Sequence, residues 1–346
     1  MNAPTPDALR AALRALAGGD AVAPEAVTAA FDVVMRGEAT PAQIAALLMG
    51  LRVQGETAEV VAAVARSLRG AMLPLVADRP DELVDTCGTG GGAVTTFNIS
   101  TAAALLAAGA GARVAKHGNR SFTSRSGSAD VLEALGVPID RPVERMQRSL
   151  AEAGLVFMFA PLMHPAMRHV GPVRRELAVP TVMNVVGPLA NPARAGRQVV
   201  GVAEAHRLPL IAGALAALGS VHALVVHGEP GMDEVSPLGP TRVLEIRGGR
   251  LTGDWQIDPA AAGFTGIAAG DLAGGSPEEN AAIIEAVLAG GGPPGARAAV
   301  LLNAAAAVYV AGLEPGYPSA LRRATAALDD GAGHRTLARL RQVYNQ

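Results

Sequence analysis

The sequence has very few of several residue types, and each scarcity limits the kind of protein it can encode. It contains one cysteine, Cys87, so no internal disulfide can form, and we expect a reducing, cytoplasmic location. Its formal net charge of −2 argues against the basic surface of a nucleic-acid binder. It shows neither an N-terminal signal peptide nor an uncharged apolar run of about 18 residues, so we expect a soluble protein without a membrane span.

The chain is rich in small apolar side chains. Half of its 346 residues are hydrophobic, although only 3% are aromatic. Ala, Leu, Val and Gly must therefore build the core, as expected when helices pack closely on a sheet. The length suggests two domains, or one large domain with an appendage.

Residues 1–70 show helical patterns only. Thr40, Pro41 and Gln43 form a capping box that predicts a helix start. A further helix is expected over about 57–68. Its apolar stripe has little to pack on within so short a segment, so we expect it to form a homodimer face: Val60, Val61, Val64 and Leu68.

From Leu83 onward, strand and helix patterns alternate, after an irregular, proline-containing stretch at 71–82. Such alternation predicts an α/β domain with a central, mainly parallel sheet covered by helices on both faces. Short strands are expected at 83–86 and 112–115. Helices are expected to open at Ser100 or Thr101 and, in the next unit, at a Ser128 cap.

A glycine loop, Gly88–Gly92, follows the first strand. Glycines let backbone N–H groups approach an anion, and a helix N-terminus adds partial positive charge. Hydroxyl and amide side chains follow directly: Thr95, Thr96, Asn98, Ser100 and Thr101. The pattern is neither a P-loop nor a dinucleotide fingerprint. An anion cradle is favoured over the alternative, a plain tight turn.

The second loop is Lys116-His117-Gly118-Asn119-Arg120, and Lys116 is the only lysine of the chain. A lone lysine among arginines indicates a site that needs a compact point charge, such as a phosphate site. His117 and Asn119 can hydrogen-bond a polar substrate, whereas His117 alone would suit a structural role. Both loops are expected at the carboxyl ends of strands in one sheet, where ligands bind.

Two further segments carry charged pairs. Arg174 and Arg175 lie in a mostly apolar helix, where a partly buried guanidinium suits a carboxylate ligand, although a surface pair is the alternative. Asp233 and Glu234 follow a predicted strand and suit Mg²⁺, although a solvated acidic turn is the alternative. The remaining histidines near Arg174, among them His164, are expected to be structural.

Together these segments resemble the anthranilate phosphoribosyltransferase family, one of the nucleoside-phosphorylase-like phosphoribosyltransferases. The resemblance covers nearly the whole chain and rests on GTGG at 88–91, NIST at 98–101, KHGNR at 116–120, GSADVLEALG at 127–136, HPAMRHVGPVRREL at 164–177, GPLANP at 187–192 and GEPGMDEVSP at 228–237. It implies transfer of a phosphoribosyl group from 5-phosphoribosyl-1-diphosphate to the amine of anthranilate, with Mg²⁺, in tryptophan biosynthesis. It also implies a homodimer formed through the helical domain.

The resemblance also assigns residues. Phosphoribosyl diphosphate would contact Gly88, Thr89, Gly90, Gly91, Thr96, Asn98, Ser100, Thr101, Lys116 and Ser128. Anthranilate would contact Gly88, His117, Asn119, Arg174, Gly187 and Pro188. Magnesium would be held by Ser100, Asp233 and Glu234. The helical domain would span 1–75 and be completed by about 175–193, leaving 76–174 and 194–346 to the α/β domain.

One position departs from the family pattern. The family usually reads GTGGD, whereas residue 92 is glycine here, so an altered Mg²⁺ dependence is expected. A pyrimidine nucleoside phosphorylase shares the architecture but would lack the GPLANP and Asp-Glu segments. A non-enzymatic, nucleic-acid-binding relative would show a basic surface and eroded acceptor residues, while this chain keeps Asn119 and Arg174.

Overall fold

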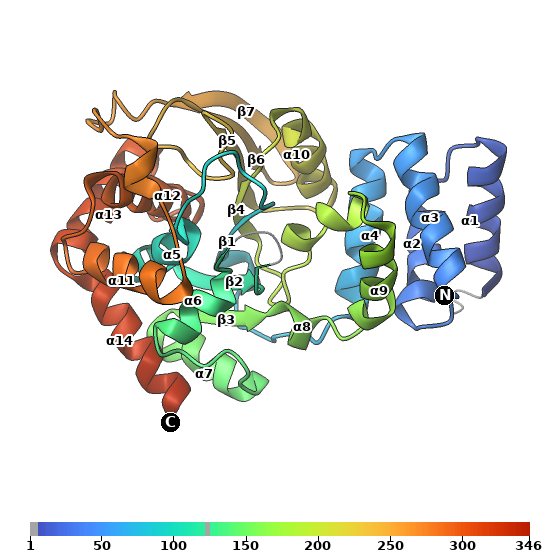
Figure 1. Ribbon diagram of the computed structural model, residues 1–346, viewed down its shortest axis with the longest axis horizontal. Coiled ribbons are helices and arrows are strands. Elements are labelled where there is room, and N and C mark those ends of the chain that lie inside the picture. The colour runs from blue at the N-terminus through green and yellow to red at the C-terminus, as the bar shows by residue number, and fades with distance from the viewer. Residues whose placement is uncertain (1–5, 122–124) are drawn as a thin grey trace.

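The computed structural model describes residues 6–121 and 125–346. Its N-terminal part is a helical bundle, at the right of Figure 1. The bundle helices are α1 (Pro6–Gly18), α2 (Pro24–Met35), α3 (Pro41–Gln54) and α4 (Ala58–Ala71). The predicted capping box is confirmed: Gln43 N–H donates to Thr40 Oγ1 over 3.3 Å, and Thr40 N–H donates to Gln43 Oε1 over 3.0 Å.

The rest of the chain forms a seven-stranded sheet in the order β3-β2-β1-β4-β5-β6-β7. Strands β1 to β5 run parallel, and the last two are antiparallel. Their bounds are β1 Leu83–Gly88, β2 Arg113–Gly118, β3 Leu155–Phe159, β4 Arg197–Gly201, β5 His222–Gly228, β6 Thr241–Arg247 and β7 Arg250–Ile257. The expected mainly parallel sheet is confirmed, and its strand order reverses between β1 and β4, where ligands bind in open α/β sheets.

Helices cover both faces of the sheet (Figure 1). One apolar core joins a sheet face to α5, α6 and the C-terminal helices, and a second joins the other face to α10 and the bundle. The remaining bounds are α5 Ile99–Gly109, α6 Ser128–Ala134, α7 Val143–Ala153, α8 Ala160–Met163, α9 Met167–Leu177, α10 Leu208–Ala217, α11 Pro277–Leu288, α12 Pro294–Val310, α13 Tyr317–Asp329 and α14 Ala332–Asn345. None of the helices in the described part of the chain is long and apolar enough to cross a membrane.

The apolar stripe of α4 is buried within the chain itself. Val61 and Val64 are fully buried, in the same core as α2 and α10. The expectation that this stripe forms a dimer face is therefore wrong. The sequence could not reveal this, because α10 begins about 150 residues further along the chain.

The chain returns to the helical bundle after β3. Helix α9 and the 3-10 helices Val182–Asn184 (η2) and Gly187–Leu189 (η3) contribute to the core of the bundle. Residues Val182–Asn184 form only a single 3-10 turn. This return brings Arg174 and Asn184 to the edge of the sheet.

Several boundaries differ from the predicted ones. Lys116 and His117 belong to β2 rather than to a loop, because β2 pairs with β3 as far as Gly118. The N-cap of α5 is Asn98, not Ser100 or Thr101. The N-cap of α6 is Gly127, and Ser128 is the first residue of that helix.

Candidate functional site

A cavity of about 460 Å³ opens at the carboxyl edge of the sheet. It lies between the ends of β1 and β2 on one side and α9 with η2 on the other. Such a volume suits a small organic substrate. Its lining is Cys87, Gly88, Thr89, Gly90, Asn98, Ser100, Lys116, His117, Gly118, Asn119, Arg120, Ser121, Gly127, Ser128, Arg174, Met183, Asn184, Asp233 and Glu234.

The glycine loop is fixed by the neighbouring strand β4. The Thr89 N–H donates to the Gly201 carbonyl over 2.9 Å, and Thr89 Oγ1 accepts from the Ala203 N–H over 3.2 Å. A Cβ atom on Gly88 would lie 2.2 Å from Asp233 Oδ2, so only glycine fits there. Gly90 has a φ of 74°, which glycine adopts without strain. These constraints fix the backbone of the loop at the cavity wall.

The acidic pair connects the glycine loop to α5. Asp233 Oδ2 accepts from the Gly90 N–H over 2.8 Å, and Glu234 accepts from the backbone N–H of Ser100. Burial raises the pKa of Asp233. Burial and the Asp233 charge together raise the pKa of Glu234 to about 8. Neither carboxylate forms an ion pair with a residue that the structure describes.

This donor set fits a hard divalent cation. No cluster of three or more acidic, histidine or cysteine side chains that could hold a metal occurs in 6–121 and 125–346. Mg²⁺ needs no such cluster, because it takes one or two carboxylates and completes its shell with water and phosphate oxygens. A cation between Asp233 and Glu234 would also relieve their mutual repulsion.

Lys116 lies at the floor of the cavity and is only 2% exposed. Its ammonium group donates to the Thr86 carbonyl over 2.5 Å and to Ser100 Oγ over 3.1 Å, with a longer contact to Thr86 Oγ1. Burial lowers the pKa of Lys116. Because Ser100 Oγ accepts from Lys116, its own hydroxyl hydrogen is left to donate elsewhere. The lysine therefore orients Ser100 in addition to supplying charge.

Two histidines lie side by side at the cavity, His117 in its lining and His164 next to it. The rings of His117 and His164 are 4.9 Å apart between centroids, at a tilt of 54°. Burial lowers the pKa of His117 to about 3 and that of His164 to about 4, while the Gly187 carbonyl opposes the shift at His117. Both rings are neutral near pH 7. No signal in the sequence indicates this pairing, because the two residues lie on different elements.

Arg174 faces the cavity from α9. Burial lowers the pKa of its half-buried guanidinium, and no residue in the described part of the chain forms an ion pair or side-chain hydrogen bond with it. Arg175 is exposed. Met183 and Asn184 of η2 also line the cavity, and the sequence analysis did not predict them.

Other residues assigned from the resemblance lie outside this cavity. Gly91, Thr96, Thr101, Gly187 and Pro188 are not part of its lining. Thr101 is 1% exposed, and its Oγ1 has no hydrogen-bond partner among the described residues. The Asn98 side chain borders the cavity but bonds to Ser126 and Asn280.

Both parts of the chain match models of known families. Residues 80–334 match the glycosyl transferase family, a/b domain, and residues 10–72 match the glycosyl transferase family, helical bundle domain. Two relatives are called anthranilate phosphoribosyltransferase. The one from Rubrobacter xylanophilus is 47% identical over 335 residues, 97% of each chain. The one from Herpetosiphon aurantiacus is 46% identical over 317 residues, 92% of this chain and 93% of the relative.

Solved structures agree with this match over the full length. Anthranilate phosphoribosyltransferase from Thermus thermophilus superposes with a TM-score of 0.90 at 42% identity, covering 97% of this chain and 99% of the other. The enzyme from Saccharomyces cerevisiae in complex with PRPP and Mg has a TM-score of 0.88 at 26% identity, covering 99% of both chains. The same enzyme in complex with 4-fluoroanthranilate has a TM-score of 0.85 at 25% identity, with the same coverage.

Proposed function

The chain belongs to the anthranilate phosphoribosyltransferase family, and on that premise we propose how its residues carry out the reaction. The enzyme transfers the 5-phosphoribosyl group from 5-phosphoribosyl-1-diphosphate to the amine of anthranilate, a step of tryptophan biosynthesis. The products are N-(5-phosphoribosyl)anthranilate and diphosphate.

One observation supports the proposed acceptor site above all others. The Arg174 guanidinium is partly desolvated, has no partner within the described chain and lines the same cavity as the glycine loop. An unpaired, half-buried cation is costly unless a ligand neutralises it. We assign the anthranilate carboxylate to Arg174, with His117, Asn119 and Gly88 around the ring. Gly187 and Pro188, which lie outside the cavity lining, would act from behind, through the Gly187 carbonyl that contacts His117. Because both His117 and His164 are neutral, they place no second positive charge to compete for the carboxylate.

The donor site is proposed at the glycine loop and the start of α5. Backbone N–H groups and the α5 N-terminus suit the diphosphate. Ser100 donates its hydroxyl, because Lys116 already occupies the acceptor side of that oxygen. The proposed donor contacts are Gly88, Thr89, Gly90, Gly91, Thr96, Asn98, Ser100, Thr101, Lys116 and Ser128. Of these, Gly91, Thr96 and Thr101 lie outside the cavity lining, and the Asn98 side chain bonds to Ser126 and Asn280, so these four would hold the wall of the donor site in place.

Magnesium would be held by Asp233, Glu234 and Ser100, together with the donor's diphosphate. When bound, it supplies charge stabilisation to the departing diphosphate. The fit rests on the two partly buried carboxylates, which line the cavity and lack an ion-pair partner in the described part of the chain.

In the proposed mechanism, most of the rate enhancement comes from positioning the two substrates. Displacement at the ribose anomeric carbon builds positive charge on the sugar and negative charge on the leaving diphosphate. Arg174 orients the anthranilate amine toward that carbon. The Ser100 hydroxyl and the partial positive charge of the α5 N-terminus stabilise the leaving group. The amine attacks in its neutral form, so no strong general base is needed and none is assigned.

The domain boundaries and assembly are part of the proposal. The helical domain comprises 1–75 with about 175–193, supported by their shared apolar core, and the α/β domain comprises 76–174 and 194–346.

A homodimer through the helical domain is proposed from the resemblance. Val53 of α3, which is 82% exposed, is a candidate contact there. Light scattering of the wild type and of Val53→Asp tests this. A cytoplasmic location is proposed from the single cysteine.

The activity is tested by following the loss of anthranilate fluorescence in the presence of phosphoribosyl diphosphate and Mg²⁺. Turnover that requires anthranilate, phosphoribosyl diphosphate and Mg²⁺ together supports the proposal. Thymidine phosphorolysis in place of this turnover would identify a nucleoside phosphorylase and overturn it.

A further inference from the structure

The chain makes an excursion between β2 and α6 whose two ends lie against each other. The first end is Asn119–Ser121, which follows Lys116 and His117, and the second is Ser126–Ser128, which opens α6. A Cβ atom on Gly127 would lie 2.4 Å from the Ser121 nitrogen and 2.6 Å from the Asn119 oxygen. The backbones of the two ends are therefore in direct contact.

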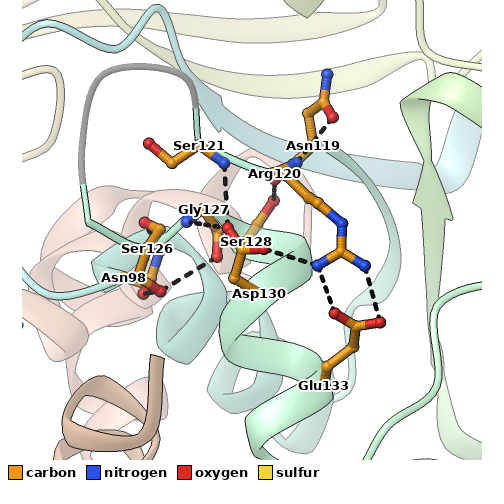
Figure 2. A network of polar contacts seen from close by, with 9 residues as sticks. All are labelled: Asn98, Asn119, Arg120, Ser121, Ser126, Gly127, Ser128, Asp130 and Glu133. Atoms are coloured by element: carbon orange, nitrogen blue, oxygen red, sulfur yellow. Dashed lines mark hydrogen bonds and ion pairs between the residues drawn. The ribbon is translucent and has the colours of Figure 1, made fainter. Parts of the chain in front are cut away.

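The Asp130 carboxylate holds these ends together, as Figure 2 shows. Asp130 Oδ2 accepts from the Ser121 N–H over 3.1 Å on one end and from the Gly127 N–H over 2.9 Å on the other. Asp130 Oδ1 accepts from Arg120 over 2.8 Å. One side chain thus makes three hydrogen bonds that span the excursion, although Asp130 itself does not line the cavity.

Arg120, which also lines the cavity, strengthens this connection. Its guanidinium forms two hydrogen bonds with Glu133, of 2.6 Å and 3.0 Å, in addition to the one with Asp130. It also lies over the Phe159 ring, with its Cζ 5.7 Å from the centroid. Both acids lie on α6, so Arg120 ties the first end of the excursion to that helix (Figure 2).

The connection continues into the cavity wall. The Asn119 carbonyl accepts from the Ala129 N–H over 3.1 Å and from Ser128 Oγ over 3.3 Å. On the other side, Asn98 Nδ2 donates to the Ser126 carbonyl over 3.1 Å. Asn119, Ser128 and Asn98 all border the cavity, so their positions depend on the contact between 119–121 and 126–128.

We propose that Asp130 is a positioning residue for phosphoribosyl transfer, because it clasps both ends of the 119–128 excursion and thereby fixes Asn119 and Ser128 in the cavity wall. The inference rests on the proposed function of that cavity. Asp130 reaches neither substrate and acts through the residues that it holds.

If Asp130 served only folding stability, its removal would lower the thermal midpoint and leave the kinetics of the folded protein unchanged. Arg120 and Glu133 are 48% and 41% exposed, and ion pairs at such sites contribute little to the free energy of unfolding. Loss of the clasp would instead let the two ends separate by a small distance. Displacements of about 1 Å in groups that position a substrate reduce rates by up to roughly 100-fold.

The test compares Asp130→Ala with Asp140→Ala, a matched control that removes an exposed acid just beyond α6. Thermal midpoints and steady-state kinetics are measured for both variants. We expect Asp130→Ala to lower kcat/KM for phosphoribosyl diphosphate by about 10- to 100-fold. Its midpoint should stay within a few degrees of the control, and Asp130→Glu should recover part of the loss.

A second variant keeps the test decisive if Asp130→Ala folds poorly. Arg120→Ala removes an exposed side chain and should reproduce much of the loss in kcat/KM. In the double variant with Asp130→Ala, the two losses should be less than additive, because they break one network.

Equal kinetics for Asp130→Ala and Asp140→Ala would overturn the inference while leaving the transferase activity of the wild type intact. A loss of activity that follows only the fall in thermal midpoint, with unchanged kinetics of the folded fraction, would also overturn it. Absence of turnover in the wild type would instead reject the proposed function.

Discussion

The side chain of Asn191 donates a hydrogen bond of 2.7 Å to Oδ2 of Asp85, although the two residues are 106 positions apart. The other carboxylate oxygen of Asp85 accepts from the His117 N–H over 3.1 Å. Asn191 also donates to the Ala115 carbonyl over 2.8 Å. This buried contact fixes the 187–192 turn against β1 and β2, beside the proposed acceptor site.

Burial of Asp85 makes stability depend on pH. Its pKa is raised from 3.8 to about 6, chiefly by burial, so the folded state holds a proton that the unfolded state has lost. The contribution of Asp85 to stability is therefore largest below about pH 4 and falls as the pH rises to about 6. Relative to the wild type, Asp85→Asn should gain roughly 2 kcal/mol of unfolding free energy between about pH 4.5 and pH 7. Urea titrations of both proteins at the two pH values measure the free energies of unfolding. A difference between variant and wild type that is the same at both pH values would contradict the prediction.

Arg174→Ala tests the carboxylate role. The variant should raise the KM for anthranilate by about 10- to 100-fold, because a charged hydrogen-bonding partner is lost. The KM for phosphoribosyl diphosphate should change far less. Arg175→Ala is the matched control, since Arg175 is exposed on the same helix. Identical anthranilate KM values for the two variants would show that Arg174 does not bind the carboxylate.

Asp233→Asn combined with Glu234→Gln tests the metal site. Both carboxylates line the cavity, so replacing them with amides removes the charge that would attract Mg²⁺. In the wild type, added Mg²⁺ with diphosphate should raise the thermal midpoint, and this increase should disappear in the double variant. Activity should fall and recover only in excess Mg²⁺. Full wild-type activity in the presence of a chelator would contradict the metal site.

Gly92→Asp tests the position where the family acid is absent. A Cβ atom there would lie 3.2 Å from Asp233 Oδ1, so an added carboxylate would stand next to the acidic pair. Without metal, repulsion should lower the thermal midpoint. With metal, the concentration of Mg²⁺ needed for half-maximal activity should fall. Gly92→Asn matches the size of the side chain without its charge and should show neither effect.

Lys116→Arg tests the need for a compact charge. The ammonium group is enclosed by Thr86 and Ser100, and a planar guanidinium exceeds the space available. We expect kcat/KM to fall by about 100-fold and overpacking to cost about 1–3 kcal/mol of stability. Kinetics and urea unfolding measure the two effects separately. Wild-type kinetics in this variant would show that any cation suffices.

Much of the architecture could be predicted because its signals are local. The capping box at Thr40 marks a helix start that the structure confirms. The alternation after Leu83 predicts parallel strands, since such strands need helical crossovers. Both loops were expected at one sheet edge, and β1 and β2 do end side by side.

Other features could not be predicted, because they depend on contacts between distant segments. Thr101 shows the same polar pattern as Ser100, yet it is buried while Ser100 borders the cavity. The ring of His164 lies against that of His117 only because β3 pairs with β2 and places the following turn there. Asn184 reaches the cavity only because the chain returns to the bundle.

The sequence by itself determined the family, the two-part organisation and the residue types of the site, since motifs and periodicity are written in consecutive positions. Only the tertiary structure decided how those residues are used. Strand pairing, helix packing and burial set which polar groups bond to each other and which remain for a ligand. These determine that Lys116 orients Ser100, that Asn98 supports the excursion and that Arg174 is left without a partner in the described chain.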